Sequence, residues 1–513
     1  MKYLQEIVQL SASLRKEKVD FFSWNKRNKP KTKFEILYSG LLDGTIFDDK
    51  SACSKLYNNS KAFKSSTYNS LKTRLFWRLT NSLFFVDQDR IFINRYNKVI
   101  YLHRKNATLV RILEYRGAIA AAAYIAKKNL PQAIEYHLAD EVCIYSMVLS
   151  QLASLSGKTN EFEKYVQIVK QWQDKKIAIT QAEVLFNRVT SWYAAQWDLQ
   201  QEKLIEISNY YNIVNSLRKE YDCYKIHETY FLLKRIHAEV EQDYNVIISI
   251  CNEALNYYKT NDKFSSNQSK AIFIIPIFSA YIWIGDYKSA FIYANECSKL
   301  LRPGSQNWFA FQEPHFILAL RSKNYQLAKQ IFIEVTTHPN FNFKNEVMIE
   351  KWRLHEFYAR FISQEDFKQT LLPKGIRGKH KHFRAFASTL PTLSKDLTGH
   401  NVVAVFAHIL YLIRIGDFDT LIQRDESLQV LRRKRLTKLN YRLGIFARMI
   451  HIMVEHNFNP VLTQKFAKKW QNKLKHMPEK FKGGTAETLE IIPFEDLWEM
   501  MMNELKAVKH NSK

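Results

Sequence analysis

The chain has 513 residues and carries 76 Lys and Arg against 50 Asp and Glu, which gives a formal net charge of +26. Apolar residues make up 46% of it and only 13 Gly and 11 Pro are present, which disfavours an all-β fold and favours helices joined by short loops. The length exceeds that of one ordinary core and predicts several domains or a repeat array, while the charge favours polyanionic partners unless it reflects a generally Lys-rich proteome.

The cysteines and the apolar runs indicate the compartment. The five cysteines are spread along the chain without a C-x-x-C pair, so we expect neither a zinc cluster nor a disulfide framework. Residues 1–24 contain a short apolar patch broken by Glu6, which does not fit a signal peptide. The most apolar run, Ala271–Ile284, is shorter than the ~20 residues of a membrane helix. These features predict a cytoplasmic protein without a membrane segment.

Residues 1–105 are predicted to form a small basic helical module. After an amphipathic helix and a basic linker, helices are expected at Lys33–Leu42, Lys50–Tyr57 and Ser65–Phe85. The third helix has an apolar stripe at helical spacing, and its basic residues lie largely off that stripe: Lys64, Lys72, Arg74 and Arg78. The three helices form either a helix-turn-helix-like fold whose third helix binds nucleic acid, or a plain structural cap on the repeats that follow.

Residues 106–370 are predicted to form an α-solenoid of helical hairpins. Just before them, Arg90–Leu102 alternates apolar and polar residues, so a short strand pair and a helix both remain open. Pro131 is expected in the first turn of a helix. Further helix pairs are expected at Glu141–Ser156 with Glu161–Gln173, Ala178–Tyr193 with Leu199–Leu217, and Asp222–Glu241 with Tyr244–Tyr258.

Two successive hairpins within residues 271–339 carry the clearest repeat signal. In each, a first apolar helix is followed by a tight turn and a turn tyrosine, Tyr287 or Tyr325. A small residue three positions later allows the second helix to lie close against the first: Ala290 and Ala328. Tyr244 begins a similar helix, and the intervals between the three tyrosines, 43 and 38 residues, are typical of stacked hairpins.

These residues resemble the tetratricopeptide-repeat family. The resemblance rests on GDYKSAFIYANECSKL (Gly285–Leu300) and KNYQLAKQIFIEV (Lys323–Val335), with a weaker match in GDFDTLIQRDESL (Gly416–Leu428). The family's strict repeat length and its first-helix consensus are absent, so no subfamily with a known peptide groove is assigned. The resemblance implies an all-α protein of stacked helix pairs whose surface binds a protein partner.

Residues 371–513 are predicted to continue the helical repeats in a basic region that ends in a capping helix opened by Pro493. Clustered basic residues there are candidates for binding a polyanion: Lys374, Arg377, Lys379, Lys381, Arg384, Arg432, Arg433, Lys434, Arg435, Lys438 and Arg442. Aromatic residues interleaved with them either stack on unpaired bases or belong to the core: Phe383, Phe386, Tyr441 and Trp470.

Catalytic and ligand-binding motifs are missing from the sequence. It contains no phosphate-binding glycine motif and no nucleophile elbow, and its histidines do not gather at ligand spacing. We therefore expect no catalytic residue, no cofactor, no metal and no small-molecule substrate.

The expected function is that of a non-enzymatic scaffold. Its repeat surface would hold a protein partner, and its basic patches would hold RNA or another polyanion. Two alternatives remain open: a helix-turn-helix DNA-binding regulator with a peptide-sensing repeat domain, and a structural subunit of a protein assembly.

Overall fold

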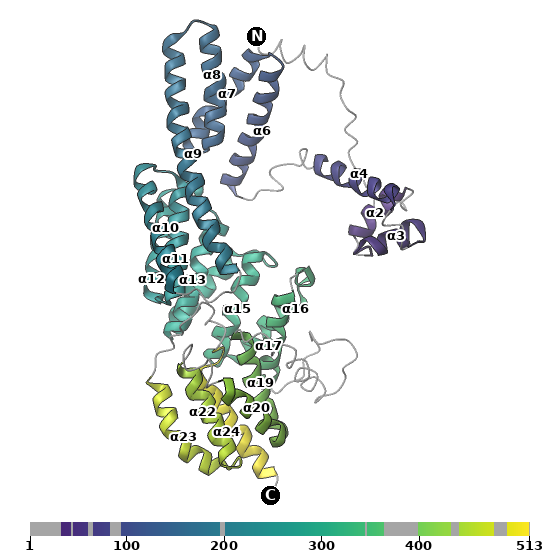
Figure 1. The fold of residues 1–513 in the computed structure, drawn as a ribbon, viewed down its shortest axis with the longest axis vertical. Coiled ribbons are helices and arrows are strands. Elements are labelled where there is room, and N and C mark those ends of the chain that lie inside the picture. The colour runs from purple at the N-terminus through teal and green to yellow at the C-terminus, as the bar shows by residue number, and fades with distance from the viewer. Residues whose placement is uncertain are drawn as a thin grey trace. The chain divides into compact units, whose positions relative to one another are not determined.

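The computed structural model describes residues 32–42, 45–59, 65–82, 94–194, 201–343, 346–363, 399–431, 441–476 and 490–511. Every regular element in these ranges is a helix, and consecutive helices pack against each other (Figure 1), which confirms the predicted all-α, solenoid-like fold. The chain forms two compact units, Met1–Gln173 and Asp174–Lys513. The predicted three-part division at residues 105 and 370 stays a prediction. None of the described helices is long and apolar enough to cross a bilayer.

The first unit begins with three short helices, α2 (Lys33–Leu42), α3 (Asp49–Tyr57) and α4 (Ser66–Ser82). They share a small core that includes the predicted apolar stripe of the third helix: Leu37, Ile46, Ala52, Cys53, Leu56, Tyr68, Leu71 and Leu75. The Asp48 side chain and the Ser51 side chain form a capping box that starts α3. A side chain at Gly40 would collide with Ile46, so only glycine lets the loop after α2 fold back this closely.

The remainder of the first unit contains α6 (Arg95–Tyr115), α7 (Ile119–Glu135) and α8 (Ala139–Leu155). The segment left open between strand and helix is helical from Arg95 onward. Buried alanines on α7 allow α6 and α8 to approach it closely: Ala121, Ala122, Ala123, Ala126 and Ala133. Pro131 lies inside α7, so its predicted place in a first turn was wrong. The proline is exposed there, and α7 runs through it at the loss of one backbone hydrogen bond.

The helix α9 (Thr159–Ala194) is a single helix of 36 residues (Figure 1). Two helices, Glu161–Gln173 and Ala178–Tyr193, were predicted in its place, and this prediction was wrong. The intervening residues contain neither glycine nor proline, so nothing in them stops a helix from continuing. The boundary between the two compact units falls inside α9.

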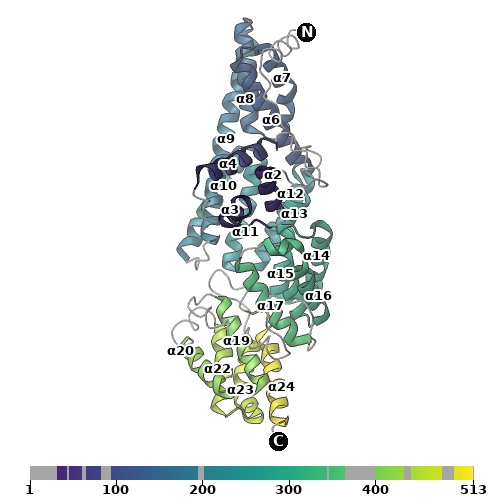
Figure 2. The same ribbon diagram turned by 90° about the vertical axis from the view of Figure 1, so that its right-hand side faces the viewer.

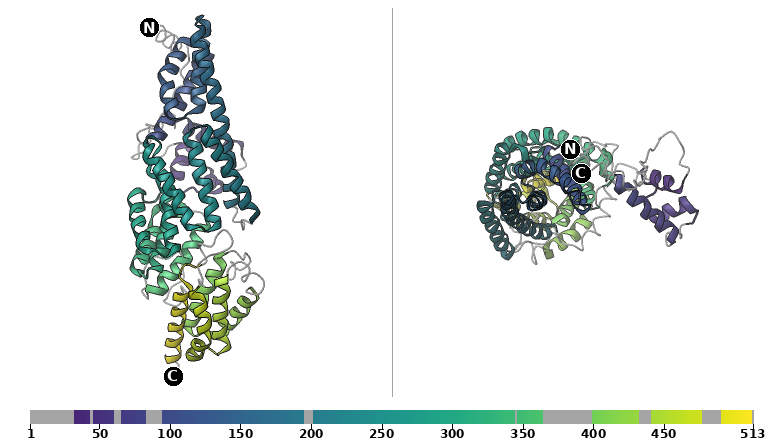
Figure 3. Two further views of the ribbon diagram at one scale, coloured as in Figure 1. Left: turned by 90° about the vertical axis from the view of Figure 1, so that its left-hand side faces the viewer. Right: turned by 90° about the horizontal axis from the view of Figure 1, so that it is seen from above.

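The second unit continues with paired helices: α10 (Gln201–Glu220), α11 (Tyr224–Glu241), α12 (Tyr244–Thr260), α13 (Asn267–Ile284), α14 (Tyr287–Leu300), α15 (Gln306–Arg321), α16 (Tyr325–Thr337) and α17 (Glu346–Ser363). Seen from above in Figure 3, the helices of this unit follow one another along a curve. The predicted hairpins α13–α14 and α15–α16 are confirmed.

The second helices of these hairpins begin in the same way. The turn tyrosine is the first helical residue of α12, α14 and α16, and the residue before it is an N-cap whose side chain accepts a backbone N–H: Asp243, Asp286 and Asn324. Ala290 and Ala328 are fully buried, as close approach of the paired helices requires. Local capping and a small contact residue therefore define each unit of the repeat.

The chain closes with α19 (Gly399–Ile415), α20 (Phe418–Leu431), α22 (Tyr441–Glu455), α23 (Pro460–Lys475) and α24 (Phe494–Asn511). Figure 2 shows α22, α23 and α24 side by side. The apolar face of α24 is buried against α19 and α23 through Phe494, Leu497, Trp498, Met501 and Leu505. Arg414 on α19 pairs with Glu504 on α24 at 2.6 Å. The predicted final helix thus covers the core of its neighbours.

Candidate functional site

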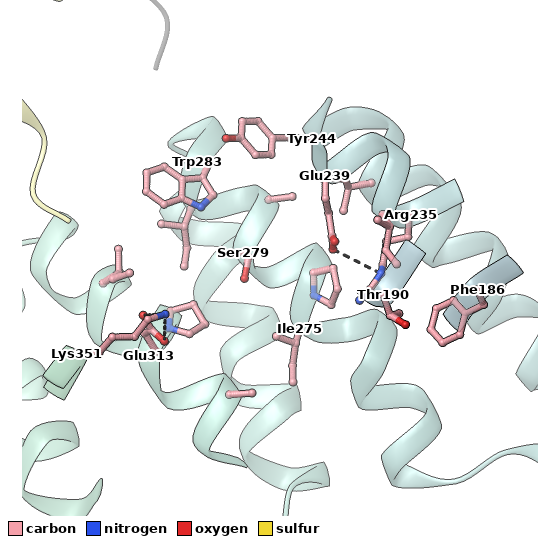
Figure 4. Close-up of a pocket in the computed structure, with 18 residues that line it drawn as sticks. Phe186, Thr190, Arg235, Glu239, Tyr244, Ile275, Ser279, Trp283, Glu313 and Lys351 are labelled. Carbon is pink, nitrogen blue, oxygen red and sulfur yellow. Dashed lines mark hydrogen bonds and ion pairs between the residues drawn. The ribbon is translucent and has the colours of Figure 1, made fainter. Parts of the chain in front are cut away.

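A cavity of about 370 Å³ opens in the second unit among α9, α11, α12, α13, α15 and α17 (Figure 4). Its apolar lining includes Ile275, Pro276, Ile282, Trp283, Pro314 and Ile317. We call it the groove cavity. Its lining comes mainly from the first helices of successive hairpins, because stacking of hairpins turns these helices toward one common surface.

Register explains why different side chains reach the groove cavity at one level. Ile275 on α13, Glu313 on α15 and Lys351 on α17 all line it. They follow one another at intervals of 38 residues, the same interval that separates Tyr287 from Tyr325. Equivalent positions of three repeats therefore carry an apolar, an acidic and a basic side chain. The repeated backbone places these side chains at one level, and the residue at each position decides what it can bind.

Two prolines inside helices shape the groove cavity. Pro276 in α13 and Pro314 in α15 occupy equivalent positions, and each removes the backbone N–H that would bond to the carbonyl four residues earlier. In α13 that carbonyl belongs to Ile272, and it accepts a hydrogen bond of 3.0 Å from Nη1 of Arg235 on α11. In α15 the corresponding carbonyl belongs to Ala310, which is exposed and lines the cavity.

Two ion pairs stand on opposite sides of the groove cavity, with Ser279 and Ile275 between them (Figure 4). Nε of Arg235 lies 3.5 Å from Oε1 of Glu239, and Nζ of Lys351 lies 3.2 Å from Oε1 of Glu313. Burial raises the pKa of the Glu239 carboxyl, and the nearby Arg235 guanidinium opposes this rise. Both carboxylates therefore face a partly apolar space beside basic neighbours, which for Glu313 include His355, whose Nε2 lies 4.0 Å from Oε1.

Of the basic residues predicted on the third helix of the first unit, the structure describes the side chains of Lys72 and Arg74. Lys72 and Arg74 are exposed on α4, and Nζ of Lys72 lies 2.7 Å from Oδ1 of Asp49 on α3. Nε of Arg74 donates to the Ser70 carbonyl at 3.4 Å. Lys64 and the side chain of Arg78 lie outside the described residues. This part of the prediction therefore rests on two exposed cations, of which one is already paired.

The predicted polyanion-binding residues of the last third mostly lie outside the described residues. This applies to Lys374, Arg377, Lys379, Lys381, Arg384, Arg432, Arg433, Lys434, Arg435 and Lys438, and to the aromatic residues Phe383 and Phe386. Of the other two aromatics, Tyr441 is half exposed with Nζ of Lys473 4.8 Å from its ring centre, and Trp470 packs against the core.

Arg442 is described, and its predicted place on an exposed basic surface was wrong. It is 3% exposed, and its Nη2 lies 2.7 Å from Glu490 and 2.8 Å from Glu495. Its Nη1 donates to the Leu474 carbonyl at 2.8 Å. Burial would lower the pKa of Arg442, but hydrogen bonds and charge from Glu490 and Glu495 raise it overall. Arg442 therefore holds α24 in place and cannot reach a polyanion.

Sequence patterns did not lead to the four charged residues of the groove cavity, Arg235, Glu239, Glu313 and Lys351. A usable signal was present, since Pro276 and Pro314 each precede a turn tyrosine by the same interval. Among the described residues, no group of three or more His, Cys, Asp or Glu side chains is placed to hold a metal ion. Comparison with known protein families and with curated proteins finds no family model and no curated protein that matches this chain.

Proposed function

We propose that this protein is a non-enzymatic binding scaffold of tetratricopeptide-like repeats, which holds an extended segment of a partner protein in the groove cavity. The observation that supports this most is the register of the cavity lining, in which equivalent positions of successive hairpins present apolar, acidic and basic side chains to one space. An extended peptide presents side chains at regular intervals and can match such a row. The excess of positive charge favours RNA or another polyanion as an additional partner.

Selection of displayed random dodecapeptides on the full chain tests the groove. We expect peptides to be enriched, and we expect Ala310→Trp to abolish their binding because an indole at this exposed position fills the cavity. Ala507→Trp, at an exposed alanine of α24, is the matched control and should leave binding intact. Failure to enrich peptides, or equal loss in both variants, would contradict the proposal and leave a structural subunit as the better description.

A second candidate function is nucleic-acid binding by α4. Asn69, Lys72, Thr73 and Phe76 are all exposed, and their spacing puts them on one face of the helix. The opposite face is buried, and Asp49 on α3 holds α4 through hydrogen bonds to Lys72 at 2.7 Å and to the Tyr68 hydroxyl at 2.7 Å. A polar face with a central aromatic residue on a helix fixed in this way suits a DNA groove.

Fluorescence anisotropy with a random DNA duplex at low salt tests the second candidate. We expect Lys72→Ala, which removes the cation of this face, to weaken binding more than Lys128→Ala, which removes an exposed cation from α7. Deletion of residues 1–105 should abolish binding. Unchanged affinity after this deletion would exclude α4 as the nucleic-acid site.

A further inference from the structure

We propose that the groove cavity is an arginine-binding site, in which a guanidinium from the partner segment is held between the Ala310 carbonyl and the Glu313 carboxylate. This inference rests on the proposed function and names the side chain that anchors the partner. The reasons lie in the two prolines inside α13 and α15. Each frees a backbone carbonyl from its helical hydrogen bond, but the carbonyl in α13 accepts a hydrogen bond from Arg235 and the one in α15 does not.

The site at Pro276 shows what a carbonyl released by proline binds in this groove. The guanidinium of Arg235 donates to the Ile272 carbonyl at 3.0 Å, and the same group lies 3.5 Å from the Glu239 carboxylate. One planar cation therefore donates a hydrogen bond to a backbone acceptor and forms an ion pair with a carboxylate. A guanidinium suits this task because its five N–H donors point in fixed directions within a plane.

The site at Pro314 contains the same two kinds of acceptor. Pro314 releases the Ala310 carbonyl, and Glu313 supplies a carboxylate from the same helix face, three residues after Ala310. Within the described residues, no side chain donates a hydrogen bond to the Ala310 carbonyl. The position in α13 that corresponds to Arg235 by the spacing of the turn tyrosines is Phe278, which is fully buried. None of the arginines that the structure describes therefore fills this site in the way that Arg235 fills the site at Pro276.

The surroundings can accept a cation even though the chain as a whole is basic. Lys351 reaches both oxygens of Glu313, at 3.2 and 3.4 Å, and Nε2 of His355 lies 4.0 Å from Oε1, but a carboxylate offers about four acceptor positions and can bind a further donor. Glu239 stands across the cavity as a further carboxylate. Positive charges elsewhere on the chain repel a cation in the cavity only weakly, since salt screens the interaction between exposed charges that lie more than about 10 Å apart. The indole of Trp283 also lines the cavity, and the guanidinium of Arg321 lies over its ring at 4.6 Å, so a guanidinium already packs on an aromatic surface at this site.

The sequences enriched in the dodecapeptide selection, followed by calorimetric titration of one enriched peptide, test the arginine site. We expect an arginine at a constant position of the enriched peptides. Replacement of this arginine by citrulline, which keeps the shape and removes the charge, should weaken binding about tenfold or more. Glu313→Gln should reduce the difference between the arginine and the citrulline peptide.

Pro314→Ala is the decisive variant, because it restores the backbone N–H that occupies the Ala310 carbonyl and should also favour the helix. We expect binding of the arginine peptide to fall about tenfold while the melting temperature does not decrease. Pro131→Ala makes the same change inside α7 and should leave binding unchanged. Enriched peptides without arginine, or full binding by Pro314→Ala, would overturn the arginine site and leave the groove proposal standing. An absence of enriched peptides would overturn both.

Discussion

The second unit contains two sets of paired basic and acidic side chains, and the two sets differ in how deeply they are buried. Beneath α24, Arg442 and Glu490 are almost fully buried, and their charged atoms bond to each other, to Glu495 and to the Leu474 carbonyl. In the groove cavity, Arg235 with Glu239 and Lys351 with Glu313 remain partly exposed and face an open space. The difference indicates that the buried charges under α24 stabilise the fold, and it motivates the proposal that the partly exposed carboxylates of the groove cavity serve a partner.

The largest expected effect comes from Glu490→Ala. Removal of this carboxylate deprives the buried Arg442 guanidinium of the carboxylate that lies 2.7 Å from its Nη2, and it removes the acceptor of the Phe494 N–H at the start of α24. We expect the free energy of unfolding to fall by about 3–5 kcal/mol. Denaturant titration of the full chain measures this loss. Glu504→Ala, which breaks the less buried pair with Arg414, is the control and should cost clearly less. Equal losses would contradict the distinction between the two kinds of pair.

The second expected effect is a loss of stability in mild acid. Burial lowers the pKa of His315 on α15 to about 4, below its ordinary value of 6.5, so the folded chain holds this imidazole neutral where the unfolded chain protonates it. The contribution of His315 to stability is fully present above pH 6.5 and is lost as the pH drops from 6.5 to about 4, by roughly 3 kcal/mol. Chemical denaturation across this range should show the slope. His315→Gln should reduce it, and an unchanged slope would assign the loss to other groups.

The hairpins could be predicted from the sequence because their signals are local. Asp243, Asp286 and Asn324 cap the helices that follow them within three residues, and the turn tyrosines mark the phase of the repeat. The long helix α9 was missed because helix formation continues wherever no residue interrupts it. Local signals therefore predict where helices begin more reliably than where adjacent helices merge.

The sites depended on contacts between distant positions, which no local pattern contains. Arg235 bonds to a carbonyl 37 residues away, and Arg442 finds Glu490 48 residues further along the chain. In the sequence Arg442 ends a basic run, so nothing near it indicates burial. Only the stacking of hairpins and the return of α24 decide which of these charges face solvent.

The third expected effect concerns the packing that brings the groove helices together. Ala290 on α14 is fully buried where this helix lies against its neighbours. Ala290→Leu adds volume to a filled contact and should lower the free energy of unfolding by about 1–3 kcal/mol. Peptide binding should weaken as well, because a wider helix pair shifts α13 and α15 apart. Denaturant titration and calorimetry measure the two effects, and Ala507→Leu at an exposed alanine is the control.

The smallest effect on stability is expected for Glu313→Gln. This variant distinguishes most clearly between the buried charges under α24 and the partly exposed charges of the groove cavity. Glu313 and Lys351 keep 22% and 25% of their side-chain surface exposed, so water replaces much of what their pairing contributes. We expect a change in the free energy of unfolding of about 1 kcal/mol or less, in contrast to Glu490→Ala. Binding of an arginine-containing peptide should nevertheless weaken, because the amide lacks the charge that attracts a guanidinium. A large loss of stability with unchanged binding would assign Glu313 to the fold and remove it from the binding site.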